Sequence, residues 1–336
     1  MRGAARPASN SAGRMQVSFI IPLFNCLAHT RECLRTLQAT LPAGLEHEIV
    51  FVDDGSTDGT REWLATLPRP CRAILNERNL GFAGACNRGA ANAAGEFLFF
   101  VNNDLVFLSG WFEPMRDAFA RFADAGLVGN IQRSVATGAI DHVGVRFDAK
   151  GKPEHDTTRP LLARLNGYRR VPAVTGACFA IRRTVWQELG AFDDGFRNGG
   201  EDVDLALRAL TSGRSNYVAL RSIVRHHVSA STGRKLRDEE NSFRLARRWR
   251  AQIAQLSARE WSRAYLATQW HGSRDATDYP LAAEALALAL GLKSAAGPAV
   301  LAGVQAALER EFVRWRELLD GETAPPVSFT GRTDEV

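Results

Sequence analysis

The chain has 336 residues, of which 45% are apolar and 24% charged, proportions typical of an ordinary globular protein. This length suggests about two domains, or one large domain with an appendage. The net charge is +5 and most basic residues are arginines, but no signature of nucleic-acid binding accompanies them, so we expect no nucleic-acid partner. The cysteines form neither a C-x-x-C pair nor a zinc-spaced cluster, which predicts reduced thiols in a cytoplasmic protein.

The sequence contains no clear targeting or membrane-spanning segment. Met1–Arg14 lacks the apolar centre of a secretory signal, and we expect it to be a disordered tail. Leu281–Leu292 is the most apolar later segment, but it is too short to cross a bilayer. The Arg-rich stretch Arg244–Arg250 suits contact with anionic lipid at the inner face of a membrane, contact with a lipid-diphosphate acceptor or, more simply, a solvated or domain-packing helix.

Short apolar strands alternate with helices along the first third of the chain. Strands are predicted at Val17–Ile21, Glu48–Val52, Arg72–Leu75 and Phe97–Val101. Helices are predicted at Leu27–Thr40, Thr60–Leu67, Ala83–Ala94 and Trp111–Phe122. This alternation predicts crossover connections and an α/β fold with a mostly parallel, Rossmann-like sheet flanked by helices.

The pattern changes after the fourth helix. The next predicted elements are a strand at Gly126–Ile131, hairpins or a loop over the site at Arg133–Pro153, a helix at Glu201–Leu210 and a strand at Asn216–Leu220. One charged helix at Arg237–Ser257 follows, and then two helices in Tyr279–Leu319 that break near Gly297. We therefore predict a tail at 1–14, an α/β domain at 15–233, a helical C-terminal extension at 234–320 and a flexible tail at 321–336.

Acidic and amide residues follow the predicted strands or begin a helix. Asp53-Asp54 and Asn102-Asn103-Asp104 follow strands, and Glu201-Asp202 begins a helix. Parallel strands bind ligands at their carboxyl ends, so the first two motifs should share an edge. Carboxylates gathered there repel one another unless a cation joins them, and oxygen ligands suit Mg²⁺ or Mn²⁺. Such an ion would neutralise a diphosphate leaving group, and a further carboxylate could accept a proton from an attacking hydroxyl.

Each motif also has a purely structural interpretation. Asp and Asn are common turn residues, and Glu201-Asp202 could simply stabilise the positive end of a helix. His226-His227 could be ordinary surface histidines, and Trp186, Phe192 and Phe196 could be core aromatics rather than residues that stack on a sugar. The first strand is followed by neither a P-loop nor a dinucleotide-binding glycine motif. The functional interpretation depends on the motifs occurring together and in order.

From about Val17 to Thr232 the sequence resembles the family-2 glycosyltransferases, which have the GT-A fold. The motifs that carry the resemblance are V-S-F-I-I-P-L-F-N (Val17–Asn25), E-I-V-F-V-D-D-G-S-T-D-G-T (Glu48–Thr60), N-L-G-F-A-G-A-C-N-R-G (Asn79–Gly89), F-V-N-N-D (Phe100–Asp104), T-G-A-C-F-A-I-R-R (Thr175–Arg183), L-G-A-F-D (Leu189–Asp193), G-E-D-V-D-L (Gly200–Leu205) and H-H-V-S-A-S (His226–Ser231). The pattern is most similar to the rhamnosyltransferase-like, non-processive branch. The Q-x-x-R-W motif of the polymer synthases has no full match, because the stretch that ends at Trp249 lacks the Gln.

The resemblance implies a role for particular residues of this chain. The nucleotide pocket would be formed by Pro22, Asn25, Asp54, Asn79, Gly81, Asn87 and Asn103. Within it, Asp54 would hydrogen-bond the imide N–H of a uracil or thymine base. Asp104, Asn102 and His226 would bind the cation, and Asp202 would be the catalytic base. Asn102 replaces the first carboxylate of the family's D-x-D motif, so we expect weaker metal binding than in an enzyme with both.

The resemblance implies inverting transfer of a sugar from a UDP- or dTDP-sugar, with Mg²⁺ or Mn²⁺, to a hydroxyl of a glycan or lipid-linked acceptor in polysaccharide biosynthesis. Two alternatives remain. A nucleotidyltransferase would need a glycine-rich loop with Arg or Lys after the first strand, where this chain has Pro22–Asn25. A non-catalytic nucleotide-sugar-binding protein would bind without turnover, and the presence of Asp202 argues against it.

Overall fold

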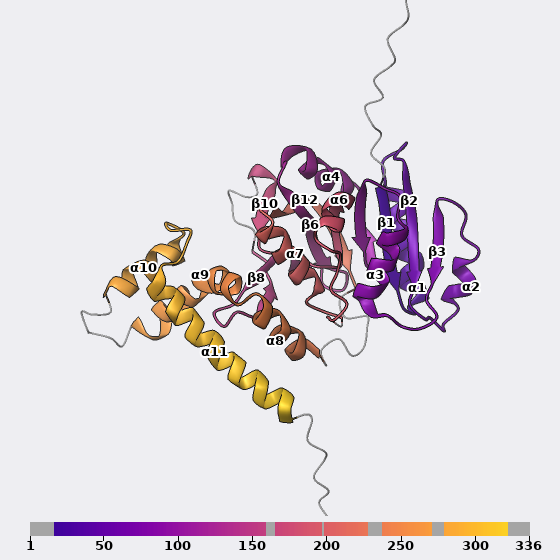
Figure 1. Ribbon diagram of the computed structural model, residues 1–336. Coiled ribbons are helices and arrows are strands. Elements are labelled where there is room, and N and C mark those ends of the chain that lie inside the picture. The colour runs from indigo at the N-terminus through magenta and orange to yellow at the C-terminus, as the bar shows by residue number, and fades with distance from the viewer. Residues whose placement is uncertain (1–16, 159–164, 197, 228–236, 271–278, 322–336) are drawn as a thin grey trace, which may run out of the picture. The chain divides into compact units, whose positions relative to one another are not determined.

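A computed structural model describes residues 17–158, 165–196, 198–227, 237–270 and 279–321 (Figure 1). The chain divides into two compact units. The first contains the residues up to Arg146 together with Glu154–Arg234, and the second contains Phe147–Pro153 together with the residues from Lys235 onward. The tails predicted at 1–14 and 321–336 lie outside the described residues, apart from Gly321.

A mixed sheet of ten strands runs through the described part of the first unit, in the order β10-β12-β6-β11-β4-β1-β2-β3 with β5 on β12 and β7 on β6. The N-terminal half consists of β1 (Val17–Leu23), β2 (His47–Asp53), β3 (Cys71–Leu75) and β4 (Phe97–Val101). Within it, β1 pairs with β2 and β4, and β2 pairs with β3, all in parallel. The predicted parallel crossover units are therefore present.

The C-terminal half of the sheet contains antiparallel pairs. Its strands are β5 (Leu105–Phe107), β6 (Ala125–Ser134), β7 (Ile140–His142), β10 (Tyr168–Val171), β11 (Cys178–Arg182) and β12 (Ser215–His226). Strand β11 lies antiparallel between β4 and β6, and β12 runs parallel to β6. Two further strands, β8 (Val145–Phe147) and β9 (Pro153–His155), pair with each other.

Strand β12 is much longer than the predicted Asn216–Leu220. After a register shift between Ala219 and Ile223, it pairs with the end of β6 and with β5. Arg221 and Ser222 interrupt the apolar pattern at this irregularity, which is why the sequence suggested an earlier end. The extension carries His226 to the end of the strand, opposite Leu105.

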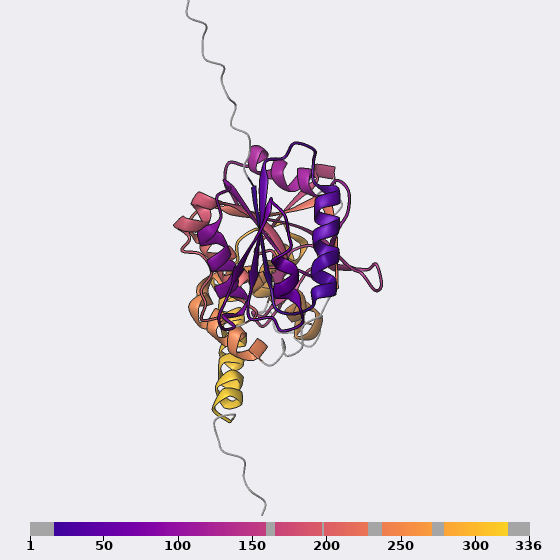
Figure 2. The ribbon, with the colours of Figure 1, turned by 90° about the vertical axis from the view of Figure 1, so that its right-hand side faces the viewer.

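Helices cover both faces of the sheet (Figure 2). They are α1 (Leu27–Thr40), α2 (Thr60–Leu64), α3 (Gly81–Asn92), α4 (Phe112–Arg121), α6 (Arg183–Glu188) and α7 (Glu201–Thr211). Side chains alternate along a strand, so β1 and β2 supply two cores. Phe19 and Phe51 pack with residues of α1 and α4, whereas Val50 and Val52 pack with Ala85 of α3.

The packing of α3 on the sheet explains one glycine of its motif. A Cβ at Gly89 would lie 2.6 Å from Ile20 Cγ2 and 2.9 Å from Val52 Cγ2, so only glycine allows this approach. On the other face, Phe19, Phe99 and Phe112 form an aromatic cluster with ring centroids 5.3–6.3 Å apart. Burial of each such ring contributes about 1.5–3 kcal/mol. These two cores fix the strand ends that carry the site.

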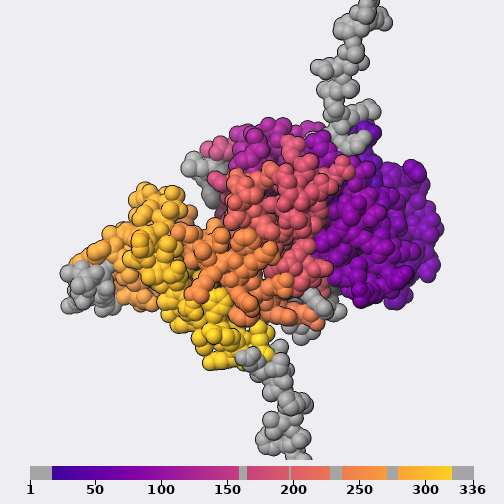
Figure 3. Space-filling view, in the orientation of Figure 1, coloured from indigo at the N-terminus to yellow at the C-terminus, as the bar shows by residue number. Residues whose placement is uncertain are grey.

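The second unit is helical, and its later helices form part of the orange and yellow surface in Figure 3. Its helices are α8 (Asp238–Arg248), α9 (Arg250–Thr268), α10 (Tyr279–Leu290) and α11 (Pro298–Gly321). The prediction of one helix at Arg237–Ser257 is wrong, because the helix is interrupted at Trp249, whose φ/ψ of −113°/26° are not helical. None of the helices in the described ranges combines the length and apolar character needed to cross a bilayer.

A half-buried carboxylate joins two helices of this unit, α8 and α11. Glu239 on α8 accepts hydrogen bonds from Trp315 Nε1 at 2.6 Å and from Arg314 at 2.7 Å, and Lys152 lies 3.3 Å away. Although desolvation raises the pKa of Glu239, these partners outweigh it and lower the pKa to about 2. Arg314 therefore serves packing between α8 and α11 within this unit.

Candidate active site

The ends of three parallel strands bring the acidic motifs to one edge of the sheet. Because β1 pairs in parallel with both β2 and β4, their carboxyl ends, with Asp53 and Asn102, face the same way. Asp54 N–H donates to the carbonyl of Leu23 at 2.8 Å, which ties the first two strand ends together. This is the edge at which open α/β sheets bind ligands.

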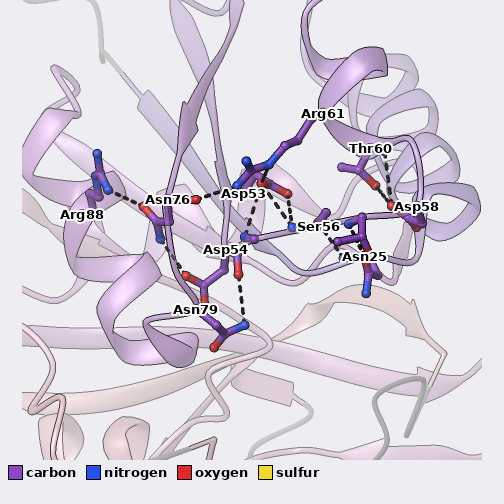
Figure 4. Close-up of polar contacts among 12 residues, drawn as sticks. Asn25, Asp53, Asp54, Ser56, Asp58, Thr60, Arg61, Asn76, Asn79 and Arg88 are labelled. Atoms are coloured by element: carbon purple, nitrogen blue, oxygen red, sulfur yellow. Dashed lines mark hydrogen bonds and ion pairs between the residues drawn. The ribbon is translucent and has the colours of Figure 1, made fainter.

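Asp54 is the centre of a hydrogen-bond network at this edge (Figure 4). Its Oδ1 accepts from Asn76 Nδ2 at 2.7 Å and from Leu80 N–H at 2.8 Å, and its Oδ2 accepts from Gly81 N–H at 2.9 Å. Asn79 closes the turn, because its Nδ2 donates to the Asp54 carbonyl and its Oδ1 accepts from Gly81 N–H. Asp54 is only 4% exposed. Its carboxylate therefore fixes the loop before α3. An ionised carboxylate has about four hydrogen-bond acceptor positions, and few of those on Asp54 remain for a nucleotide base.

The neighbouring Asp53 has a different partner. It is fully buried and forms an ion pair of 2.6 Å with Arg61, whose Nη2 also donates to the Asn76 carbonyl at 2.6 Å. Its carboxylate accepts further bonds from Gly55 and Ser56 N–H. Figure 4 shows that Arg61 and Asp53 lie beside the Asp54 network, with Asn76 between them and Arg88. Asp53 therefore has a structural role as the ion-pair partner of Arg61, whereas Asp54 holds the loop before α3.

The predicted nucleotide residues on other elements are mainly engaged with the backbone. Pro22 is buried in β1. Asn25 has a left-handed φ of 58°, its N–H donates to Ser56 Oγ at 2.7 Å, and its Oδ1 accepts from Thr57 N–H at 2.8 Å. It therefore joins the end of β1 to the loop after β2.

Two predicted pocket residues point toward protein partners. Asn87 donates to the Phe192 carbonyl at 2.9 Å and accepts from Phe192 N–H at 3.0 Å. This pair of bonds uses both ends of its amide to tie α3 to the loop before α7. Asn103 Nδ2 donates to Thr30 Oγ1 on α1 at 2.9 Å. Both side chains therefore position backbone around the edge.

Asp104 and His226 lie side by side although 122 residues separate them. Their side chains are largely buried, with His226 Nε2 3.2 Å from Asp104 Oδ1. The pairing of β5 with β12 creates this contact, because His226 lies opposite Leu105. The backbone supports it further, since His227 N–H donates to the Asp104 carbonyl at 3.1 Å. The structure thus brings together two of the three predicted metal ligands.

Several buried polar atoms at this edge lack hydrogen-bond partners among the described residues. They are Asn102 Oδ1, Asp104 Oδ1 and His226 Nδ1. The 3.2 Å approach of His226 to Asp104 Oδ1 is not aligned as a hydrogen bond, so it does not satisfy the carboxylate oxygen. Unpartnered buried polar atoms are costly, and carboxylate, amide and imidazole groups are the ligands that Mn²⁺ and related ions accept. These residues therefore fit a divalent cation.

Asp202 lies in the first turn of α7, and its carboxylate is held by main-chain donors. Oδ2 accepts from Gly176 N–H at 2.6 Å, and Oδ1 accepts from Val203 N–H at 2.8 Å. The next residue after Gly176, Ala177, accepts through its carbonyl from Asn102 N–H at 2.8 Å. Gly176 and Ala177 therefore link the Asp202 carboxylate directly to the strand end that carries Asn102.

Charges of the first and the third acidic motif both act on one buried thiol. Burial raises the pKa of the Cys86 thiol on α3 well above its usual value, and the charges of Glu201 and Asp54 raise it further. Glu201 is itself buried and accepts from Gly199 N–H at 2.9 Å, which shapes the glycine turn before α7.

His142 and Gln132 are site residues that the sequence did not suggest. His142 Nε2 accepts from Thr175 N–H at 3.3 Å, so Nδ1 carries the proton, and it has no partner in the described part of the chain. Both amide atoms of Gln132, opposite His142 in the sheet, are likewise buried without partners. Burial, reinforced by repulsion from His155 and His226, holds the His142 pKa well below its usual value. A single His in a glycine-rich segment forms no recognisable motif. His142 can be found only from the pairing of β6 with β7, which places it opposite Gln132.

The aromatic residues near the site belong to the core. Trp186, Phe192 and Phe196 are each at most 4% exposed, and Trp186 packs on Phe192 with ring centroids 5.0 Å apart. Phe100 completes the cluster at 4.5 Å from Trp186. One interpretation of the sequence was that a sugar stacks on these rings. Their burial does not fit that role. Val228–Ser231 of the last motif lie outside the described residues.

A sheet with a parallel N-terminal half, and with polar motifs at the carboxyl ends of those strands, is the arrangement of the GT-A fold. The family model "Glycosyl transferase family 2" matches residues 18–190, which is just over half of the chain. The chain therefore belongs to glycosyl transferase family 2.

Curated relatives are similar over part of their length. The protein y4gI of Sinorhizobium fredii is 28% identical over 253 residues, which cover 68% of this chain and 28% of the relative. The N-acetylglucosaminyl-diphospho-decaprenol L-rhamnosyltransferase of Mycobacterium tuberculosis is 28% identical over 212 residues, or 55% of this chain and 68% of the relative. The chain spans only 18–38% of the length of several relatives that it matches.

Solved structures support the fold. GalNAc-T7, solved with UDP, GalNAc and Mn²⁺, superposes with a TM-score of 0.60 at 18% identity, covering 80% of this chain and 54% of that one. The mannosyltransferase PcManGT of Pyrobaculum calidifontis, solved with GDP-Man and Mn²⁺, gives a TM-score of 0.53 at 19% identity, covering 92% and 88%. At these identities the comparison establishes the GT-A fold alone.

Proposed function

We propose that this protein transfers a sugar from a nucleoside-diphosphate sugar to a hydroxyl acceptor by a single, inverting displacement. The observation that carries the proposal is the position of Asp202, whose carboxylate is connected through Gly176 and Ala177 to Asn102. A candidate base and a candidate cation site therefore lie at the same end of β4. Residues 15–233 would form the transferase domain, and residues 234–320 a helical extension.

Asn102, Asp104 and His226 would hold a divalent cation, Mg²⁺ or Mn²⁺. Their unpartnered buried atoms support this assignment, and both solved neighbours named above contain Mn²⁺. When bound, the ion would neutralise the charge of a diphosphate leaving group. Because a neutralised diphosphate leaves without protonation, the chain needs no second carboxylic acid of the kind that glycosidases use.

Asp202 would remove the proton from the attacking acceptor hydroxyl. Each of its oxygens accepts one main-chain hydrogen bond, which fixes the carboxylate and leaves an acceptor position on each oxygen. His142 and Gln132, with their unpartnered polar atoms, would provide hydrogen bonds on the same side of the site, to water or to the bound sugar.

The loop that Asp54 holds would form one wall of the nucleotide pocket. Asn25, Asn79 and Gly81 would shape it through the contacts described above, with Pro22, Asn87 and Asn103 supporting neighbouring backbone. We propose a UDP- or dTDP-sugar as the donor and a glycan or lipid-linked acceptor in polysaccharide biosynthesis, on the cytoplasmic side of the membrane. The similarity to a rhamnosyltransferase and to the O-antigen biosynthesis protein RfbC of Myxococcus xanthus supports this acceptor class.

A panel of nucleotide sugars tests the proposal. Each donor would be tested for calorimetric binding with Mn²⁺, and for slow hydrolysis to free nucleotide with and without chelator. We expect at least one donor to bind and to be hydrolysed only when the cation is present. Absence of binding across UDP-, dTDP- and GDP-sugars would contradict the proposal, and formation of a nucleoside triphosphate and a sugar 1-phosphate when pyrophosphate is added would favour a nucleotidyltransferase.

A further inference from the structure

Three side chains outside the proposed catalytic set gather beside α1. His29 and Glu32 lie one turn apart on this helix, and His227 follows the end of β12. Within this His29–Glu32–His227 cluster, one nitrogen or oxygen from each residue lies within 4.8 Å of the others. The two imidazole rings are 4.4 Å apart, and His227 Nε2 lies 3.5 Å from Glu32 Oε2. Residues 198 positions apart in sequence thus converge on one point.

The cluster is distinct from the Asp104–His226 pair. His226 turns toward Asp104, whereas the next residue, His227, turns toward α1. Successive side chains of extended backbone point to opposite sides, so the two histidines serve different neighbours. The Asn103–Thr30 hydrogen bond also joins α1 to the segment between β4 and β5.

The three side chains of this cluster do not satisfy one another's hydrogen-bonding atoms. His227 Nε2 is buried and has no hydrogen-bond partner among the residues described, because its approach to Glu32 is too long and poorly aligned. All three residues are half-buried, so an ion could reach them from solvent. Two imidazoles with one carboxylate, and a fourth position for water, are the ligands of many zinc sites. Mg²⁺, which prefers oxygen ligands and keeps its waters, suits this set poorly.

We propose that His29, Glu32 and His227 form a second cation site, which takes Zn²⁺ or a similar divalent transition-metal ion. An ion there would fasten α1 to the end of β12. The proposal does not depend on the glycosyltransferase activity, because none of the three side chains belongs to the proposed catalytic set.

The test is zinc binding to the full chain after chelation, with Mg²⁺ in millimolar excess to occupy oxygen-ligand sites. Zinc uptake would be measured by calorimetry and by a metallochromic indicator. We expect one zinc per chain in the wild type. Both His29→Ala and Glu32→Gln should lose at least about tenfold in affinity, because loss of even an outer-shell partner of a metal ligand typically costs about 10–100-fold. The controls His47→Ala and Glu46→Gln change the same residue types elsewhere and should bind zinc normally.

A second readout protects the test against misfolded variants. Zinc should raise the thermal unfolding midpoint of the wild type and the controls but not of His29→Ala, while all these proteins unfold alike without zinc. Cys26, the N-cap residue of α1, is a thiol three residues before His29, and Cys26→Ser should keep the site. Full zinc affinity in His29→Ala, or loss of the site in Cys26→Ser alone, would overturn the proposal.

Discussion

Replacement of Asp202 by Asn is the most informative perturbation of the proposed reaction. Asn has nearly the same shape but cannot accept a proton, and general base catalysis typically contributes about 10²–10⁴-fold. At about 1.36 kcal/mol per tenfold, this corresponds to about 2.7–5.4 kcal/mol of lost transition-state stabilisation. We therefore expect kcat to fall by at least about 10²-fold, while nucleotide binding survives because Asp202 has no role in the pocket around Asp54.

The structure also predicts a cost in stability. The carboxylate accepts from Gly176 N–H through one oxygen and from Val203 N–H through the other, and an amide has only one oxygen. One main-chain donor would be left facing the amide NH₂, which costs about 1–3 kcal/mol if the donor stays dry. Denaturant unfolding should detect this loss, and activity should be measured where the variant is fully folded.

The assay compares kcat and KM at saturating cation for the wild type, Asp202→Asn and a matched control. Asp194→Asn serves as the control, because Asp194 is an exposed carboxylate in the loop before α7. We expect the control to retain activity. If Asp202→Asn kept wild-type turnover, Asp202 would not be the base. The same conclusion would follow if Asp202→Asn lost donor binding and turnover to the same extent.

Three further predictions concern the cation, the nucleotide and pH. Asn102→Asp should tighten Mn²⁺ binding in calorimetry, because it adds a charge where an amide oxygen is unpartnered; unchanged affinity would contradict a metal role for Asn102. Asp54→Asn should weaken nucleotide binding and lower the unfolding free energy by about 1–3 kcal/mol, because Asp54 accepts from Asn76, Leu80 and Gly81; intact binding would argue against this pocket. The pKa of His142 is depressed in the folded protein, so below about pH 6.5 the unfolded chain binds a proton that the folded chain does not. The neutral His142 ring therefore contributes its full stabilisation above that pH. Below it, the free energy of unfolding falls by at most about 1.36 kcal/mol per pH unit. Urea unfolding between pH 7.5 and 5.5 should show a smaller slope in His142→Gln, and an unchanged slope would refute a buried neutral ring.

The N-terminal half of the fold could be predicted because its signals are local. Each strand from β1 to β3 is a short apolar run followed by a helix before the next strand, and such alternation favours a parallel arrangement that includes β4. The edge on which Asp54 and Asn102 lie follows directly from that arrangement. The order of the motifs then indicated the family, which the match over residues 18–190 confirms.

The remaining features depend on contacts between distant residues. Nothing local indicates that β11 inserts antiparallel between β4 and β6, or that β12 continues past Arg221 to bring His226 against Asp104. The break at Trp249 was also missed, because the residues on both sides are good helix formers.

Side-chain roles were the least predictable part of the site. The Asp54 carboxylate was expected to meet a nucleotide base, and in the structure its main partners are Asn76, Leu80 and Gly81. Asn87 is similarly engaged with the Phe192 backbone. Asx side chains commonly bond to nearby backbone, and the sequence cannot distinguish this use from ligand binding.

The anomeric configuration of the transferred sugar tests the proposed chemistry most directly. A donor that the panel identifies would be turned over with Mn²⁺ and water as the acceptor, and the free sugar released would be examined by proton NMR before it mutarotates. A single displacement assisted by Asp202 predicts a product of inverted configuration. Retention of the donor's configuration would contradict the mechanism, because it requires a path other than one direct attack on the anomeric carbon.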